Sequence, residues 1–415
     1  MILGYVQNNN LMNIGFHQTL SVVSIAIFFT NVPDYARGRL GLLYPNLWVA
    51  GLGVLALPLL TRQITKSEIL RSPVLIWCLG YAWVTIVWFL GSSQSDVGWQ
   101  AVRSRFLSII ELLLFLAIFA DHRANRVARQ ALVVAVFGAV LLQVYEMFFP
   151  MSFSEILGRS AGLYMNPNAA GMALVTGMIC AVTVLPLHYR CGFLLMTGVG
   201  VMASVSRASI LAWGIGMLGL LVIRRVRFRD IVVTGTMGLV VVILMLIPRW
   251  DEFAATLERN GSINKNVEER LGWLADPSGV SDASSWSRIY VAKRAWDRIG
   301  ENPFLGNGTG SSFQDEIAPH NQSLAFMQDH GVLGALILPL LLLAVILSVR
   351  GENQRTAIVF SVTVMFLSFF SHDVLSARHT LLLLALAATM TDDKHSHLSE
   401  SARLTTPHWN RGSSK

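Results

Sequence analysis

The stretch that decides the fold is CGFLLMTGVGVMASVSRASILAWGIGMLGLLVI, residues 191–223. Its 33 residues are nearly all apolar, and Ser206-Arg207 interrupts them near the middle. A single helix of this length would extend about 50 Å, whereas the hydrocarbon core of a bilayer is about 30 Å thick. The stretch therefore predicts two short helices that fold back on each other in a membrane, with the turn between Ser204 and Ser209.

The rest of the chain has the same apolar character. Hydrophobic residues make up 53% and charged residues 14% of its 415 residues, whereas about a quarter of a soluble domain is charged. This composition excludes a soluble protein. Lipid admits only helices and closed barrels, and the apolar runs have helix length without the alternation of strands. We therefore predict an all-α polytopic membrane protein with about twelve transmembrane helices, the first an anchor and not a removed signal peptide.

The distribution of cations predicts the orientation of the chain. Of the 32 Lys and Arg residues, 17 fall in loops and a tail on the side of the N-terminus, seven in the opposite short loops and eight in one long polar segment. Cytoplasmic loops carry the excess of cations, so both termini are expected in the cytoplasm. The net charge of +7 favours lipid headgroups over nucleic acid as the partner.

Four regions follow from this topology. Residues 1–248 are predicted to hold transmembrane helices one to nine, and residues 331–391 helices ten to twelve. Between them, residues 249–330 are expected to form a large outward-facing loop domain with short amphipathic helices. Residues 392–415 are polar and aperiodic, which predicts a disordered cytoplasmic tail.

Arg207 stands at the turn of the predicted hairpin. A hairpin with such short arms cannot lift its tip into bulk water, so we expect Arg207 at or below the outer membrane surface. A cation at this depth usually faces a cavity or an anion. The alternative is an arginine that reaches out to lipid phosphate. We favour the interpretation in which Arg207 binds a ligand.

A second cation is placed on an apolar helix face. WSRIYVAKRAWDRIGEN, residues 286–302, reads as a helix that ends before Pro303. At 100° per residue, one arc of this helix gathers Ala295, Arg288, Ile299, Ala292, Trp296 and Ile289. Arg288 is the one charge on that face, and an inward cation needs an anion. A structural ion pair is possible, but few acidic residues are suitable partners, so we favour a ligand phosphate.

Two further features lie between this helix and the next span. The segment FLGNGTGSSF, residues 304–313, could present backbone N–H groups to an anion, although a turn that only redirects the chain explains it as well. His320 follows at the membrane border. A lone histidine is more often structural, but its position and a free pKa near 6.5 suit a general base.

Other polar residues are expected to be structural. Glu111 and Glu146 lie in predicted spans as hydrogen-bond partners, although Glu111 could line a cavity. Asp315 and Glu316 could hold a metal or orient His320, but an adjacent acidic pair is usually solvated. The same structural interpretation applies to His372, Asp373 and His379. Cys78, Cys180 and Cys191 lie in or beside apolar runs, which argues against disulfides and a zinc site.

Four segments together resemble the O-antigen ligase and O-antigen polymerase superfamily, integral membrane glycosyltransferases of the bacterial envelope. They are Asn166-Pro167-Asn168, Ser206-Arg207, residues 287–313 and residues 319–334. The motifs cover residues 160–350, and the topology covers the whole chain. The resemblance implies a GT-C-like helical fold in the bacterial inner membrane, with the active site on the periplasmic face.

The resemblance also implies a reaction. For a ligase, the donor is a polysaccharide on undecaprenyl diphosphate and the acceptor is the lipid A-core oligosaccharide, joined without metal, nucleotide or other cofactor. The family's catalytic roles fall on His320 and Arg288, and its diphosphate-binding roles on Arg207, Arg288, Asn321 and Arg270. Arg259 and Lys265 are alternatives to Arg270 for a further loop cation.

The chemistry of the residues agrees with these roles. Negative charge develops on the leaving diphosphate, and arginines offer planar, two-pronged phosphate contacts. A histidine can take the proton of the attacking hydroxyl, which inverts the anomeric centre. A polymerase with the same donor is the close alternative. A twelve-span polysaccharide transporter is a more distant one, because transporters place their polar residues near the bilayer midplane.

Overall fold

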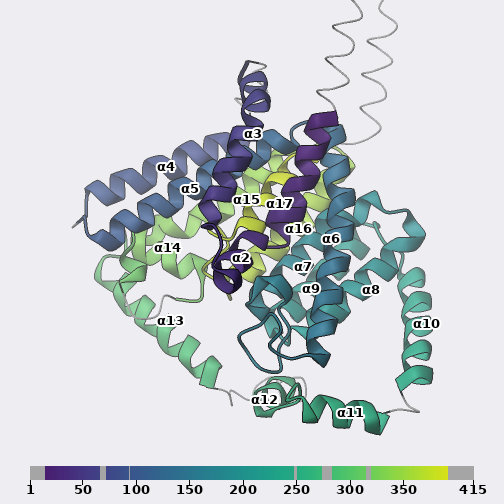
Figure 1. Ribbon diagram of the computed structural model, residues 1–415. Coiled ribbons are helices and arrows are strands. Elements are labelled where there is room, and N and C mark those ends of the chain that lie inside the picture. The colour runs from purple at the N-terminus through teal and green to yellow at the C-terminus, as the bar shows by residue number, and fades with distance from the viewer. Residues whose placement is uncertain are drawn as a thin grey trace, which may run out of the picture.

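The computed structural model describes residues 15–65, 72–92, 94–246, 250–272, 283–314 and 319–390. Within these ranges the chain is helical and has no strand (Figure 1). A helix from Gly15 to Phe29 comes first and ends in the π-helical turn Ile25–Phe29. The α-helices that follow are α2 (Val32–Leu40), α3 (Pro45–Thr65), α4 (Pro73–Leu90), α5 (Asp96–Phe119), α6 (His122–Phe148), α7 (Pro167–Ala181), α8 (Leu187–Ala203), α9 (Arg207–Val222), α10 (Phe228–Leu246), α11 (Trp250–Arg259), α12 (Lys265–Gly272), α13 (Ala283–Glu301), α14 (Gln322–His330), α15 (Ile337–Ser348), α16 (Glu352–Ser368) and α17 (Arg378–Ala388).

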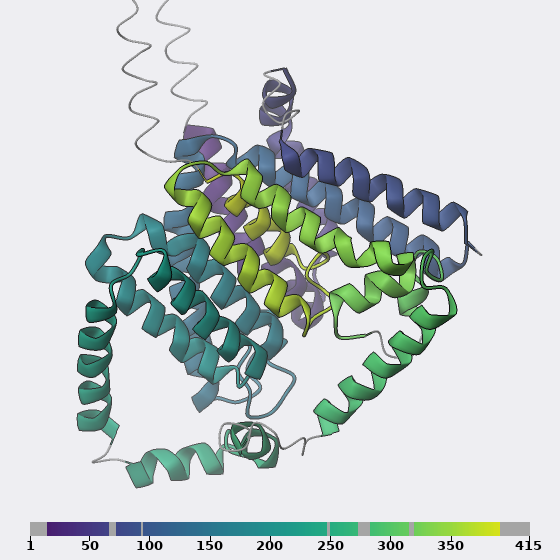
Figure 2. The same ribbon diagram turned by 180° about the vertical axis from the view of Figure 1, so that it is seen from behind.

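Two helices, α7 and α17, form the centre of the bundle. All residues of α7 from Ala170 to Ala181 and all residues of α17 from His379 to Ala388 are buried. A helix that is buried on every side needs small or apolar residues all round, and both sequences supply them. At Gly177 of α7, an added Cβ would lie 2.8 Å from the ring of Phe29. Helices α5, α6, α8, α9, α15 and α16 pack around this pair, whereas α10 to α13 form an arc at the edge of the bundle (Figures 1 and 2).

The apolar helices are those of an α-helical membrane protein. Among the described residues, four helices are long and apolar enough to cross a bilayer, or five if the bent pair Gly15–Phe29 and Val32–Leu40 counts as one span. The four are Pro73–Leu90, His122–Phe148, Pro167–Val184 and Gln322–Ser348. Several further helices are apolar but shorter, so the number of twelve spans stays a prediction.

The predicted hairpin is confirmed, with its turn at Ser204–Ser206 between α8 and α9. Val205 in this turn has φ of +48°, a left-handed conformation that is strained for a β-branched residue. The chain leaves α8 through the hydrogen bond from the Val205 N–H to the Met202 carbonyl, at 2.9 Å. The N–H of Ser160 donates to the Ala203 carbonyl at 3.1 Å, so the loop after α6 supports the turn.

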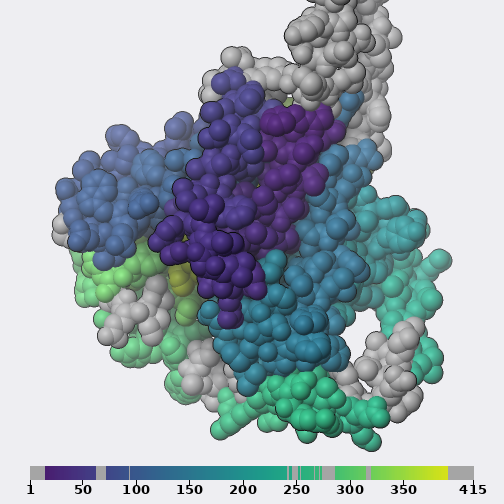
Figure 3. All heavy atoms as spheres, in the orientation of Figure 1, coloured from purple at the N-terminus to yellow at the C-terminus, as the bar shows by residue number. Residues whose placement is uncertain are grey.

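Helices α11 and α12 lie across one end of the bundle, which we call the loop side (Figure 3). Their connection is fixed to the end of α6, where the Asn260 side chain donates to the Phe148 carbonyl at 2.8 Å and Ser262 donates to the Met147 carbonyl at 2.6 Å. Short helices are thus present in the described part of residues 249–330, while the outward-facing loop domain stays a prediction.

Helix α13 connects the loop side to the next apolar helix. Its residues Ala295 and Ile299 pack against Leu324 of α14. That helix runs from Gln322 to Ser348 through α14, a 3-10 turn and α15. It therefore begins nine residues before the predicted span at 331, because the Asn321 side chain caps it by accepting from the Leu324 N–H at 3.1 Å. Asp315, Glu316 and the predicted tail 392–415 lie outside the described residues.

The glycine-rich segment binds an anion that belongs to the chain. The Asp329 carboxylate accepts from the N–H groups of Gly310 at 3.1 Å and Ser312 at 2.8 Å, and from the Ser311 hydroxyl at 3.0 Å. Arg105 of α5 forms a buried ion pair with the same carboxylate. The glycines therefore redirect the chain around Asp329, and this is the structural interpretation of that segment.

Candidate functional site

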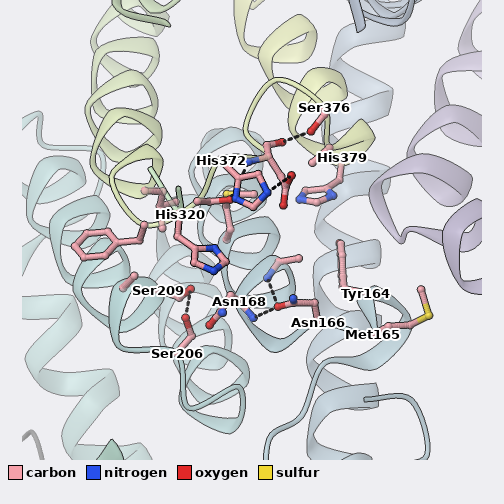
Figure 4. A pocket seen from close by; sticks show the side chains of 18 of the residues that line it. Tyr164, Met165, Asn166, Asn168, Ser206, Ser209, His320, His372, Ser376 and His379 are labelled. Atoms are coloured by element: carbon pink, nitrogen blue, oxygen red, sulfur yellow. Dashed lines mark hydrogen bonds and ion pairs between the residues drawn. The ribbon is translucent and has the colours of Figure 1, made fainter. Parts of the chain in front are cut away.

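A cavity of about 500 Å³ opens on the loop side of the bundle. Its wall comes from α2, the segment that leads into α7, the start of α9, α12, α13 and the connection between α16 and α17. We call it the arginine cavity, because its lining includes Arg207, Arg270, Arg288 and Arg378. Figure 4 shows part of its lining, with Asn166, Asn168, His320 and His372 among the labelled side chains.

The structure brings the predicted site residues together. Arg207, Arg270, Arg288 and His320 line the arginine cavity, although they come from α9, α12, α13 and the segment before α14. Asn321 lines an adjoining cavity of about 370 Å³, which also contacts Arg207, Arg288 and His320. The two alternatives to Arg270, Arg259 and Lys265, are not among the residues that line either cavity.

Arg207 is positioned by the hairpin turn. It is the first residue of α9, so its guanidinium lies at the loop-side end of the helix and not along a lipid-facing flank. Its Nη2 donates to the Glu269 carbonyl of α12 at 3.3 Å, which joins the hairpin to the outer helices. The role of Arg207 in binding a ligand stays a prediction.

Arg288 is positioned by the inward face of α13. Val291, Ala295 and Ile299 on this face are buried, and Arg288 is half-buried next to them. The predicted arc was too wide on one side: Trp296 is 55% exposed and Ile289 50% exposed. Apolar residues of a membrane protein can also face lipid, which a helical wheel does not distinguish from packing.

A further arginine, Arg159, lies next to the arginine cavity, and from the sequence it counted only as a cation of a short loop. Arg159 is buried, with Nε donating to the Ser204 carbonyl at 3.1 Å and Nη2 donating to Asn168 Oδ1 at 2.9 Å. Burial, followed by the charges of Arg270, Arg288 and Arg207, lowers the pKa of Arg159 to about 9. Arg159 therefore lies close enough to these three guanidiniums for their charges to act on it.

His320 lines the arginine cavity beside a second histidine, His372. The ring centroids of His320 and His372 are 5.4 Å apart, and His372 Nε2 is 3.3 Å from Asp373 Oδ1 (Figure 4). Partial burial, then His372 and Arg288, lower the pKa of His320 below 6.5, while Asp373 acts in the opposite direction. His320 is therefore neutral at physiological pH, which is the form that can accept a proton.

Hydroxyl and amide groups complete the cavity. Asn166 caps α7 by accepting from the Asn168 N–H at 2.8 Å, and both asparagines line the cavity. The Ser209 hydroxyl donates to Ser206 Oγ at 3.0 Å on the first turn of α9. These groups can orient a sugar or phosphate through hydrogen bonds. Pro167 at the first helical position explains why the Asn-Pro-Asn segment starts a helix here.

The carboxylates that the sequence left as structural have clear partners. Glu111 Oε1 is 3.3 Å from Nε of Arg378. The Nη1 atom of the same arginine is 3.1 Å from Asp34 Oδ1. Glu146 accepts from backbone N–H groups of the loop after α6, including Phe153 at 2.9 Å and Ala161 at 2.7 Å. Glu146 therefore holds the loop that carries Arg159.

The histidines set aside from the sequence lie closer to the site than expected. His372, Asp373 and His379 all line the arginine cavity. Among the residues that the structure describes, no group of three or more His, Cys, Asp or Glu side chains is close enough to bind one metal ion.

Two less polar cavities adjoin the arginines. The 370 Å³ cavity is bordered by Leu211, Ile289, Leu324 and Phe369 next to the predicted site residues. A cavity of about 530 Å³ lies on the other side of the hairpin turn, with Val205, Met202 and Arg159 in its lining. The turn between α8 and α9 thus lies between the arginine cavity and the less polar cavity of about 530 Å³.

The comparisons with known proteins bear on the segment that supplies most of these residues. Residues 191–339 match the family model described as O-antigen ligase. The match extends from α8 to the start of α15 and includes Arg207, Arg270, Arg288 and His320. A search of curated proteins finds no match to the chain.

Proposed function

Since the chain carries the domain of the O-antigen ligase and polymerase superfamily at residues 191–339, we propose that it is an O-antigen ligase. In this proposal it transfers a polysaccharide from undecaprenyl diphosphate to the lipid A-core oligosaccharide, on the periplasmic face of the bacterial inner membrane. The observation that carries the proposal is the arginine cavity, where three predicted arginines and His320 surround one space.

The arginines bind the diphosphate. Arg207 and Arg288 line both the arginine cavity and the adjoining cavity, and Arg270 lines the first. Guanidinium groups contact phosphate oxygens in pairs, and they stabilise the charge that develops as the diphosphate leaves. Arg159 is a positioning residue in this scheme, because it holds the hairpin turn and Asn168 from behind.

His320 is the general base. It takes the proton of an acceptor hydroxyl while that oxygen forms a bond to the anomeric carbon. The bond from this carbon to the diphosphate oxygen breaks, and the electron pair stays on the diphosphate. Attack opposite to the leaving group inverts the anomeric centre. The donor's own diphosphate bond supplies the free energy, so the proposed reaction requires no metal or nucleotide.

The adjoining cavity suits the lipid part of the donor. Its apolar border contains Leu211 of α9, Leu324 of α14 and Phe369 at the end of α16. A polyprenyl chain is a hydrocarbon, so it would reach the arginines from the bilayer along this border while its diphosphate enters the arginine cavity.

One reconstitution tests the proposed reaction. Purified protein in vesicles receives lipid-linked polysaccharide and lipid A-core, with chelator and without nucleotide. Formation of polysaccharide-bearing lipid A-core is the expected result. Elongation of the donor polysaccharide, with the lipid A-core unchanged, would overturn the ligase assignment in favour of a polymerase. No product of either kind from folded, monodisperse protein would overturn the transferase assignment.

A gene deletion gives an independent answer in cells. Loss of a ligase leaves long polymer on the lipid carrier and bare core. Loss of a polymerase leaves single repeat units on the core, which would contradict the proposal.

A further inference from the structure

One face of α13 is apolar and exposed. Trp286, Ile289, Lys293 and Trp296 follow one another at steps of three, four and three residues, which places them on one stripe of the helix. Trp286 is 61% exposed, Ile289 50% and Trp296 55%. We call these four residues the α13 stripe. Contiguous apolar side chains of this size mark a surface that contacts lipid or another molecule.

The start of the stripe adjoins helices that face lipid. Ile289 borders the 370 Å³ cavity together with Leu211 of α9 and Phe369 at the end of α16. Leu211 is 41% exposed and Phe369 46% exposed. Leu211 lies in α9, and Phe369 directly follows α16. Both helices are apolar, and the outward side chains of such helices face hydrocarbon in a membrane protein. The apolar surface of these helices therefore continues onto α13.

The other end of α13 is attached to a candidate membrane span. In the turn after α13, Phe304 is 76% exposed and Leu305 70% exposed. The indole N–H of Trp88 donates to the Leu305 carbonyl, and Trp88 lies near the end of the span Pro73–Leu90. Figure 1 shows the end of α13 close to α4 and α5, with the helix extending from there toward α12. Both ends of the helix thus lie where apolar helices end.

The composition of α13 is that of an interfacial helix. Trp and Tyr concentrate at the boundary between headgroups and acyl chains, and α13 also exposes Tyr290. Lysine can extend from such a stripe to headgroups. The helix carries four cations and two anions, which are Arg288, Lys293, Arg294, Arg298, Asp297 and Glu301. Anionic phospholipids attract this excess of positive charge.

We propose that α13 lies on the outer leaflet of the membrane, with the α13 stripe among the headgroups and upper acyl chains and Arg288 turned toward the arginine cavity. A protein partner would also cover an apolar face, but the continuity with α4, α9 and α16 selects lipid. The inference does not depend on the proposed reaction. It places Arg288 at the depth where the headgroup of a membrane lipid is anchored.

Site-directed fluorescence measures this arrangement. The three native cysteines are buried, so a thiol-reactive fluorophore reports on single introduced cysteines, with wild type as the labelling blank. Ile289→Cys and Trp296→Cys test the stripe. Ser287→Cys and Glu301→Cys are the matched controls, because both residues are exposed but lie on another side of the same helix. The full chain is placed in vesicles of phosphatidylethanolamine and phosphatidylglycerol.

Two quenchers give opposite readings. Lipids brominated in the acyl chains should quench the stripe labels several-fold more than the control labels, and aqueous iodide should do the reverse. Equal iodide quenching at all four positions would place α13 in water and overturn the inference. Protection of the stripe labels from both quenchers would show that protein covers the stripe, and would also overturn it. Either result leaves the transfer assay as a separate test of the reaction.

Discussion

Arg105 and the arginines of the cavity represent two ways of placing guanidinium groups inside one protein. Arg105 contacts Asp329 and lies 2.6 Å from His330 Nε2, and the glycine-rich segment adds its N–H groups to the same carboxylate. Arg207, Arg270 and Arg288 instead border an open cavity. Arg105 is thus buried against a carboxylate of the protein, whereas the other three arginines line a cavity of about 500 Å³. Residues 287–313 and 319–334 contribute to both arrangements. The glycine-rich segment and Asp329 belong to the structural ion pair, and Arg288 and His320 line the arginine cavity.

The largest expected effect is a loss of transfer rate when residues of the arginine cavity are changed. His320→Ala should lower the transfer rate by about 10²–10⁴, because the hydroxyl loses its general base. Arg288→Ala should lower it by about 10²–10³, since one charge-stabilising group is removed. The rate of product formation by purified protein in vesicles is the measurement. The midpoints of thermal unfolding of both variants should match that of wild type. A large drop in either midpoint would mean that the residue is structural, as Arg105 is.

The structural side should respond in stability. Asp329→Ala leaves Arg105 buried without its carboxylate and should destabilise the fold by about 3–5 kcal/mol. Thermal unfolding in detergent measures this. Arg225→Ala is the control, because its partner Glu352 is 61% exposed and the pair should contribute only about 0–1 kcal/mol. Equal thermal midpoints for the two variants would remove the basis for calling Asp329 structural.

A smaller effect separates charge from geometry at the hairpin turn. Arg207→Lys keeps the positive charge but loses the two-pronged contact, so transfer should fall by about 10–100-fold, the value of a charge-assisted hydrogen bond. Titration of the rate against donor concentration shows whether binding or catalysis is lost. Wild-type kinetics in this variant would return Arg207 to the role of a headgroup contact.

The smallest effect concerns pH. Because the pKa of His320 is lowered, activity should persist below pH 6.5 and fall only as His320 becomes protonated. His372→Gln removes a group that lowers this pKa, so the acid limb should move to higher pH. Asp373→Asn removes a group that raises it, so the limb should move the other way. Shifts of equal sign in the pH profiles of kcat/KM would rule out His320 as the titrating base.

Local signals account for the part of the molecule that the sequence predicts well. The length of residues 191–223 requires a reversal, and the polar pair Ser206-Arg207 marks it. The helical period turns Arg288 inward. Each of these depends on a few neighbouring residues and on the thickness of a bilayer.

The remaining features depend on contacts between distant segments. Arg159 is recognisable only from its bonds to Ser204 and Asn168, which the fold brings to it. His372 lies 52 positions from His320 and belongs to the site through the packing of the last two helices. A helical wheel also placed Trp296 with the packed residues, because hydrophobicity alone does not separate a protein core from a lipid surface.

The left-handed backbone of Val205 should make the arginine cavity more sensitive to heat than the rest of the helical bundle. A left-handed valine lies at a local free energy on the order of 1–3 kcal/mol above its relaxed conformation, and the packing and hydrogen bonds of the turn keep it there. Moderate heating should weaken the packing of Met202 and the other apolar side chains around the turn. Val205 could then relax to an ordinary backbone conformation, and Arg207 would move away from Arg270 and Arg288. The protein should therefore lose its catalytic competence several degrees before its helices melt.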